Sequence, residues 1–152
     1  MALTEKAGEI VNDLIKINND RIEGYTRASK ETKDADADLK KTFNSMVNQS
    51  VEYKQTLTDL VRQAGLEPEK GTRTDGKIYR AWMDVKATFS GNSRKSVLEN
   101  CEFGEDAALK AYKSALSSDG ELSQEARTVI TDQQQALRSS LQQAPRPSPA
   151  AG

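Results

Sequence analysis

The 152-residue sequence contains no histidine. Histidine is the commonest general base, the usual partner of a catalytic serine and the commonest transition-metal ligand. No other set of residues in the chain forms a familiar catalytic centre. The sequence therefore favours a non-enzymatic role, while leaving open an enzyme built on other groups.

Cysteine is almost absent as well. The single cysteine, Cys101, cannot form an internal disulfide. The first ten residues, MALTEKAGEI, lack the basic start and apolar stretch of a secretion signal. No run approaches the roughly 18 to 20 consecutive apolar residues that cross a bilayer. We therefore expect a soluble protein of a reducing cytoplasm that does not bind membranes.

The chain also lacks an excess of charge of either sign. It has 22 lysines and arginines against 23 acidic residues, a net charge of −1. No global field therefore draws it to nucleic acid. The glycine-rich frames that hold nucleotide phosphates are missing too.

Apolar residues instead recur at steps of three and four, as on one face of an amphipathic helix. The pattern predicts a first helix over about residues 4–30, opening at Thr4, and a second that begins after Asp34 or Asp36 and ends at Gly65. On the second helix the apolar seam follows alternating steps of four and three. Its positions are Leu39, Phe43, Met46, Ser50, Tyr53, Leu57, Leu60 and Ala64.

The second half of the chain predicts two further helical arms. Apolar spacing in the third arm is interrupted by the sequence SGNS, so we expect this arm to be split or kinked near Gly91. A last helix, capped by Asp119 or Ser123, carries apolar residues to Leu141. Residues 144–152 hold three prolines and no large apolar side chain, which predicts a disordered tail.

These elements predict an all-α fold, an antiparallel four-helix bundle formed by a single domain over residues 1–143. Short connections place successive helices antiparallel, whereas the long loop of residues 65–76 permits a crossover along the bundle. A ferritin-like topology carries one such crossover, between its second and third helices.

Three groups of residues carry a resemblance to a known family: Asp20 with Glu23-Gly24-Tyr25, the stretch Tyr79 to Met83, and Cys101 to Asp106 followed by Tyr112. From about Ile10 to Leu141 the chain resembles a bacterial family of ferritin-like four-helix-bundle proteins of unknown function. The resemblance implies a cytoplasmic protein without an assigned reaction, with a link to stress responses.

One carboxylate, Glu105, falls on the apolar seam of the third arm and is predicted to be buried. Burial without a partner costs several kcal/mol, so a compensating group is expected. The candidates are a metal ion, an arginine such as Arg80, or the hydroxyl of Tyr25 or Tyr53. Polar residues also fall midway along the other seams, which predicts a polar layer across the bundle. They are Asn18, Ser50 and Gln133.

A metal site in that layer would use Glu105 with Glu102 and Glu23. Ferritin-like di-iron sites use two glutamates and two Glu-x-x-His pairs, and both histidines are missing here. Oxygen ligands alone can bind iron or another divalent metal, with poorer selectivity. The alternative is a buried hydrogen-bond network.

Other residues suggest chemistry less strongly. Cys101 lies on the seam, where a free cysteine behaves as a small hydrophobe, and nearby carboxylates would raise its pKa. Aromatic residues recur at core spacing, which indicates packing. Basic residues around the long loop alternate with acidic ones, as on a solvated surface. They are Lys70, Arg73, Lys77 and Arg80.

Two functional hypotheses follow. In the first, the bundle is non-enzymatic and acts through its surface, by forming a homo-oligomer or by binding another protein. In the second, it is a carboxylate-based metal-binding or oxidoreductase-like member of the ferritin-like class, which requires Glu23, Glu102 and Glu105 to converge.

Overall fold

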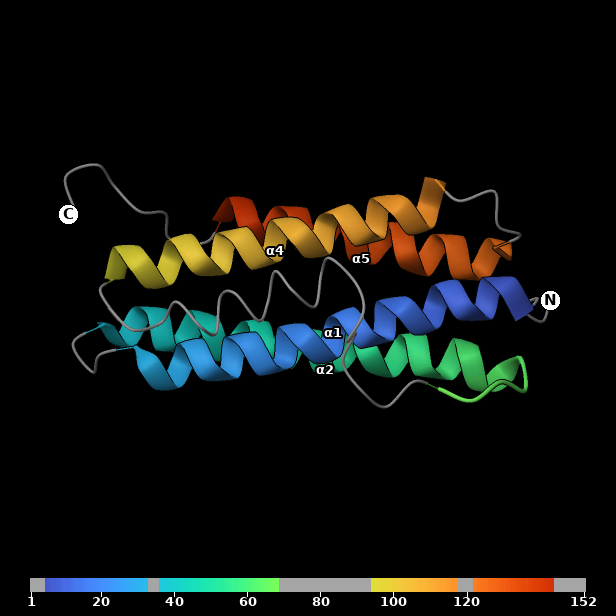
Figure 1. Ribbon diagram of the computed structural model, residues 1–152, viewed down its shortest axis with the longest axis horizontal. Coiled ribbons are helices and arrows are strands. Elements are labelled where there is room, and N and C mark those ends of the chain that lie inside the picture. Colours follow the sequence, from blue (N-terminus) through green and yellow to red (C-terminus); the bar gives the residue numbers. More distant parts are fainter. Residues whose placement is uncertain (1–4, 33–35, 69–93, 118–121, 144–152) are drawn as a thin grey trace.

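A computed structural model of the chain describes residues 5–32, 36–68, 94–117 and 122–143. These ranges contain four helices and no strand: α1 (Glu5–Glu31), α2 (Ala37–Gln63), α4 (Arg94–Ser117) and α5 (Gln124–Gln143). The helices lie side by side along the longest axis of the molecule (Figure 1). The predicted all-α class is thus confirmed. Within the described ranges, no helix combines the length and apolar character needed to cross a membrane.

The order of contacts shows how α1 and α2 run along each other. Near the start of α1, Asn12 Nδ2 donates a hydrogen bond to the Glu67 carbonyl, just beyond the end of α2. Near the end of α1, Ser29 Oγ donates to Asn44 Oδ1, close to the start of α2. Rising residue numbers on α1 therefore meet falling numbers on α2. In Figure 1, α2 and α4 begin at the same end of the molecule.

The predicted helix caps are realised in part. Ser123 Oγ accepts a hydrogen bond from the Ala126 N–H at 3.1 Å, as an N-cap hydroxyl does. Asp36 occupies the N-cap position of α2, but its side chain makes no capping hydrogen bond. α4 is continuous from Arg94 to Ser117. Several predicted features lie outside the described residues: Thr4, Asp34, the kink near Gly91, Asp119 and the tail 144–152.

The predicted C-terminus of α2 at Gly65 is confirmed, and its geometry is a Schellman motif. Gly65 has a φ of +77°, in the left-handed region. Its N–H donates to the Arg62 carbonyl at 2.9 Å, and the Leu66 N–H donates to the Val61 carbonyl at 3.1 Å. The turn aims Leu66 at α1, where it meets the bare backbone of Gly8. The helix end is thereby capped and joined to its neighbour.

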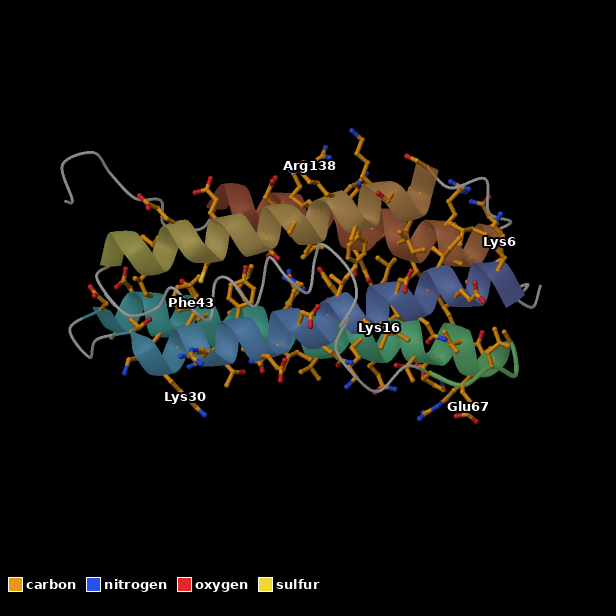
Figure 2. The ribbon with its side chains drawn as sticks, viewed as in Figure 1. Lys6, Lys16, Lys30, Phe43, Glu67 and Arg138 are labelled. Carbon is orange, nitrogen blue, oxygen red and sulfur yellow. The ribbon has the colours of Figure 1, made fainter. Side chains whose placement is uncertain are left out.

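The buried apolar residues form two clusters along the helices. The larger comprises Ala7, Val11, Leu14, Ile15, Ile17, Leu57, Leu60, Val61, Ala108, Ala111, Tyr112, Ala115, Ala126, Ile130 and Leu137. The smaller comprises Tyr25, Ala28, Leu39, Phe43, Met46, Leu98 and Cys101. Phe43 points inward between the helices, whereas Lys30 and Arg138 project outward (Figure 2). The apolar seam predicted for α2 faces this interior; its members Tyr53 and Ala64 are half-buried.

The cap at Gly65 yields a stability prediction. No side chain or backbone atom of the described residues lies within 4 Å of an added Cβ, so only the positive φ penalises a substitution. Gly65→Ala should lower the free energy of unfolding by about 1 kcal/mol in urea denaturation. Gly65→Asn should lose less, because asparagine adopts the left-handed conformation more readily. Equal losses for the two variants would contradict this explanation.

Candidate functional site

Between the two apolar clusters lies a layer of polar side chains. On α1 the larger cluster ends at Ile17 and the smaller begins at Tyr25. The residues of the layer come from all four helices and are joined by hydrogen bonds. They are Asn18 and Arg21 of α1, Gln49 of α2, Glu105 and Tyr112 of α4, and Gln133 of α5.

The centre of the layer is an ion pair between Arg21 and Glu105. Arg21 Nε donates to Glu105 Oε1 at 2.8 Å, and Nη2 donates to Oε2 at 2.9 Å. The guanidinium thus binds both carboxylate oxygens in the two-pronged geometry that makes such pairs strong. Both side chains are wholly inaccessible to solvent. The pair ties the middle of α1 to the middle of α4.

The remaining donors of Arg21 reach its other neighbours. Nη1 donates to Asn18 Oδ1 at 3.1 Å, and Nη2 also donates to Gln49 Oε1 at 2.8 Å. The guanidinium carbon lies 5.8 Å from the centre of the Tyr25 ring, within the range of a cation–π interaction. Arg21 therefore bonds to α1, α2 and α4 at once.

From Asn18 the network continues to the fourth helix. Asn18 Nδ2 donates to the Tyr112 hydroxyl at 2.8 Å, and that hydroxyl donates to Gln133 Oε1 at 2.7 Å. Gln133 Nε2 donates in turn to the Tyr53 carbonyl at 3.4 Å, which returns the network to α2. In this series each residue donates a hydrogen bond to the next, from Asn18 through Tyr112 and Gln133 to the Tyr53 carbonyl.

Such a network is costly to interrupt. Removing one member of a buried ion pair leaves an uncompensated charge and typically costs about 3–5 kcal/mol, whereas replacing both with apolar groups can be neutral. We therefore expect the network to favour one arrangement of the helices more than it adds to overall stability. A slide of α1 by one turn would separate Arg21 from Glu105 by about 5.4 Å.

Burial shapes the ionisation of the groups in and around the layer. Desolvation acts to lower the pKa of Arg21, but the adjacent Glu105 charge and hydrogen bond leave that pKa raised. Burial and the Glu105 charge raise the pKa of Tyr25 and of the Cys101 thiol. Burial also raises the pKa of Tyr112, although its hydrogen bond from Asn18 opposes the shift. The tyrosines and the thiol are thus held in their neutral forms.

The burial expected for Glu105 is confirmed, since it is wholly inaccessible to solvent. Its compensating cation is Arg21 and not Arg80, which lies outside the described residues. Of the expected tyrosines, Tyr25 lies near enough to Glu105 for the carboxylate charge to raise its pKa, after the larger effect of burial. Tyr53 is half-buried and contributes its backbone carbonyl to the network.

The three carboxylates suggested for a metal site lie in different environments. Glu105 is buried against Arg21, Glu102 is half-buried and Glu23 is exposed. No group of three or more histidine, cysteine, aspartate or glutamate residues that could hold a metal ion occurs in the described part of the chain. The structure therefore does not bring Glu23, Glu102 and Glu105 together.

The expected polar layer exists, with differences in its members. Asn18 and Gln133 belong to it, whereas the buried Ser50 hydroxyl donates within its own helix to the Met46 carbonyl at 2.7 Å. Arg21 was not anticipated, although steps of three and four from Asn18 lead to Arg21 and then Tyr25. The expected apolar stripe passed instead through Ile22, which is only half-buried. Periodicity alone would have placed Arg21 on the seam.

Mutations in the ion pair should show strong coupling. Arg21→Met and Glu105→Leu should each lower the free energy of unfolding by about 3–5 kcal/mol, because each leaves a buried charge. The double variant should lose much less than the sum of the two. Urea denaturation measures all three values, and additive losses would contradict the paired arrangement.

The exposed pair formed by Asp106 and Lys110 provides a matched control on the same helix. Lys110 Nζ lies 3.3 Å from Asp106 Oδ2, and the two side chains are 77% and 56% exposed. Asp106→Asn should change the free energy of unfolding by less than about 1 kcal/mol. A loss as large as that of the Arg21 and Glu105 variants would show that burial is not the deciding factor.

Raised pKa values also predict the response to alkali. The raised pKa of Tyr112 means that the unfolded chain releases this proton near the ordinary tyrosine value of 10.0, while the folded chain keeps it. Below pH 10.0, ionisation of Tyr112 should not change the free energy of unfolding. Above it, stability should fall by about 1.4 kcal/mol per pH unit for each such group.

The alkaline loss can be assigned by substitution. Urea denaturation between neutral pH and roughly pH 11 should show a shallower decline for Tyr112→Phe than for the parent chain. Cys101→Ala should remove the part of the decline that begins near the ordinary thiol value of 9.0. A flat profile in the parent chain would contradict the burial of these groups.

Comparison with known proteins adds a family but no activity. Residues 6–118 match the family described as a domain of unknown function, DUF2383. The match contains Arg21, Gln49, Glu105 and Tyr112 of the network, and ends before Gln133. It is shorter than the span of resemblance expected from the sequence. Neither curated proteins nor solved structures provide a match to the chain. The chain belongs to the DUF2383 family.

Proposed function

We propose that this chain is an antiparallel four-helix bundle of ferritin-like topology that acts without catalysis, by associating with another copy of itself or with a different protein. The opposite running order of α1 and α2 supports the antiparallel arrangement. The common starting end of α2 and α4 supports a crossover between the second and third helices (Figure 1). A role in stress responses, implied by the sequence resemblance, is part of this proposal.

The main support for the proposal is the ion pair between Glu105 and Arg21. In ferritin-like di-iron proteins, carboxylates of the bundle core face metal cations. Here both oxygens of the core carboxylate accept hydrogen bonds from a guanidinium of the same chain. The protein supplies its own cation at this position. The pair is also closed to solvent, so a substrate has no access to it.

The surface supports reversible association. Within the described ranges, Val51 is the exposed large hydrophobic residue, with half of its surface accessible. Permanent homodimer interfaces are larger and more apolar than transient ones. A mainly polar contact that forms and dissociates readily therefore fits this surface better than a permanent dimer. Such association should depend on protein concentration and on salt.

The metal-binding alternative predicts a different composition of the purified protein. We expect protein prepared without chelator to contain substoichiometric iron and other divalent metals by elemental analysis. Glu105→Gln should leave that content unchanged, because the carboxylate is engaged with Arg21. A stoichiometric metal that disappears in Glu105→Gln would overturn the non-metal assignment.

Self-association can be followed on the same samples. Sedimentation velocity over roughly 1 to 100 μM should show a sedimentation coefficient that rises with concentration and falls with added salt. Glu105→Gln also serves as a control here, because a buried residue should not alter a surface contact once the variant is shown to be folded. A concentration-independent monomer would contradict self-association.

A further inference from the structure

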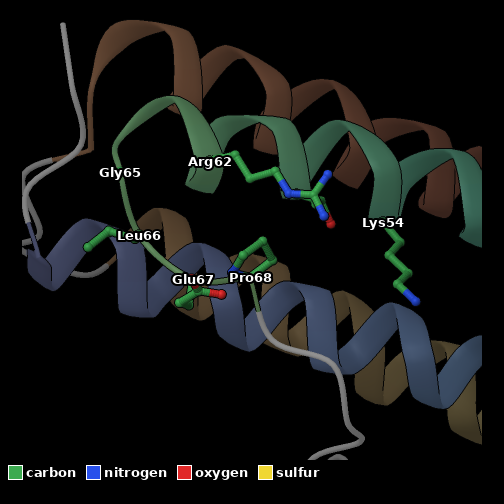
Figure 3. Close-up of a pocket in the computed structure, with 7 residues that line it drawn as sticks. Lys54, Arg62, Gly65, Leu66, Glu67 and Pro68 are labelled. Carbon is green, nitrogen blue, oxygen red and sulfur yellow. The ribbon is translucent and has the colours of Figure 1, made fainter.

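A cleft of about 520 Å³ lies at the C-terminal end of α2. One wall is a single face of α2, and the other is the segment that leaves the helix (Figure 3). Its volume falls in the range of small-molecule sites. The side chains that line it are those of Lys54, Thr58, Arg62, Leu66, Glu67 and Pro68.

The α2 wall carries two cationic side chains and one hydroxyl on the same face of the helix. Lys54, Thr58 and Arg62 are spaced by four residues, so their side chains lie above one another on the helix. Thr58 is only 8% exposed, yet it lines the cleft. Other threonines of α2, such as Thr42 and Thr56, donate to the carbonyl four residues back, whereas Thr58 forms no such bond within the described ranges. Its hydroxyl is available to a ligand.

The two cations of the α2 wall are Lys54 and Arg62. Among the described residues, neither Lys54 nor Arg62 forms an ion pair, in contrast to Arg21 and Lys110. Both project from α2 at the cleft (Figure 3). The nearby carbonyl end of α2 would repel an anion, but the Schellman bonds occupy its Val61 and Arg62 carbonyls. The helix wall is therefore net positive.

We propose that this cleft binds a phosphoryl group through Lys54, Thr58 and Arg62. Arginine offers a fork that matches two phosphate oxygens, lysine a point charge and threonine a hydroxyl donor. The apolar surfaces of Leu66 and Pro68 line the same cleft and suit the organic part of a phosphomonoester. Glu67 also lines it and opposes a dianion, which favours ligands that carry a donor beside the phosphate. This site is separate from the residues used for the proposed function.

Binding is tested with inorganic phosphate and phenyl phosphate as probes, by amide chemical-shift titration of the full chain at low salt. Both should move resonances of residues 54–68. Arg62→Gln and Lys54→Met should each weaken binding about tenfold, and Thr58→Val less. Glu67→Gln should strengthen it. Tighter binding of phenyl phosphate would support a phosphomonoester ligand, and equal binding would support free phosphate.

A double variant with the same change in net charge provides the matched control. Lys113→Met with Arg138→Gln removes two exposed cations from α4 and α5, and it should leave phosphate binding unchanged. The proposal is overturned if neither probe shifts the α2 resonances. It is also overturned if the control double variant weakens binding as much as Arg62→Gln with Lys54→Met.

Discussion

The structure depends on one requirement, that the charge of Glu105 be neutralised inside the helical assembly. A carboxylate closed to solvent is tolerated only with a partner of opposite charge and with hydrogen bonds to both oxygens. Arg21 provides both from the facing helix, at 2.8 and 2.9 Å. Because its remaining donors reach Asn18 and Gln49, the same guanidinium also fixes α1 relative to α2.

The apolar core is organised around this requirement. On α1, α2 and α4 the two clusters lie on opposite sides of the polar layer, whereas on α5 the apolar residues on both sides of Gln133 belong to the larger cluster. Apolar contacts contribute most of the stability but tolerate shifts along the helix axis. Directional bonds among Arg21, Asn18, Tyr112 and Gln133 do not tolerate them. We therefore infer that apolar burial holds the helices together and that the polar layer selects their register.

Much of this arrangement could be predicted from helical periodicity. Steps of three and four located the helices, the α2 seam and the burial of Glu105, and the glycine at position 65 indicated where α2 ends. The identity of its partner could not be predicted, because a contact between α1 and α4 depends on three-dimensional packing. Arg21 occupied a seam position, but a charged residue is rarely buried. The burial of Arg21 is favourable only because Glu105, on the facing helix, carries the opposite charge.

The metal hypothesis illustrates the same limit. Sequence spacing identifies carboxylates that could converge, but it does not show which way each helix face turns. In the structure Glu23 is exposed and Glu102 only half-buried, so Glu105 remains the one core carboxylate of the three. A cation was needed there, as the sequence indicated, and the chain supplies it from its own side chains.

Nuclear magnetic resonance of the Arg21 side chain tests the central claim most directly. A guanidinium enclosed by Glu105, Asn18 and Gln49 should give an Nε–H signal that exchanges slowly with water at neutral pH and correlates across its hydrogen bond with the Glu105 carboxyl carbon. Arg21→Lys, which lacks this signal, assigns it. An Nε–H that exchanges as fast as that of free arginine, with no correlation to Glu105, would contradict the account.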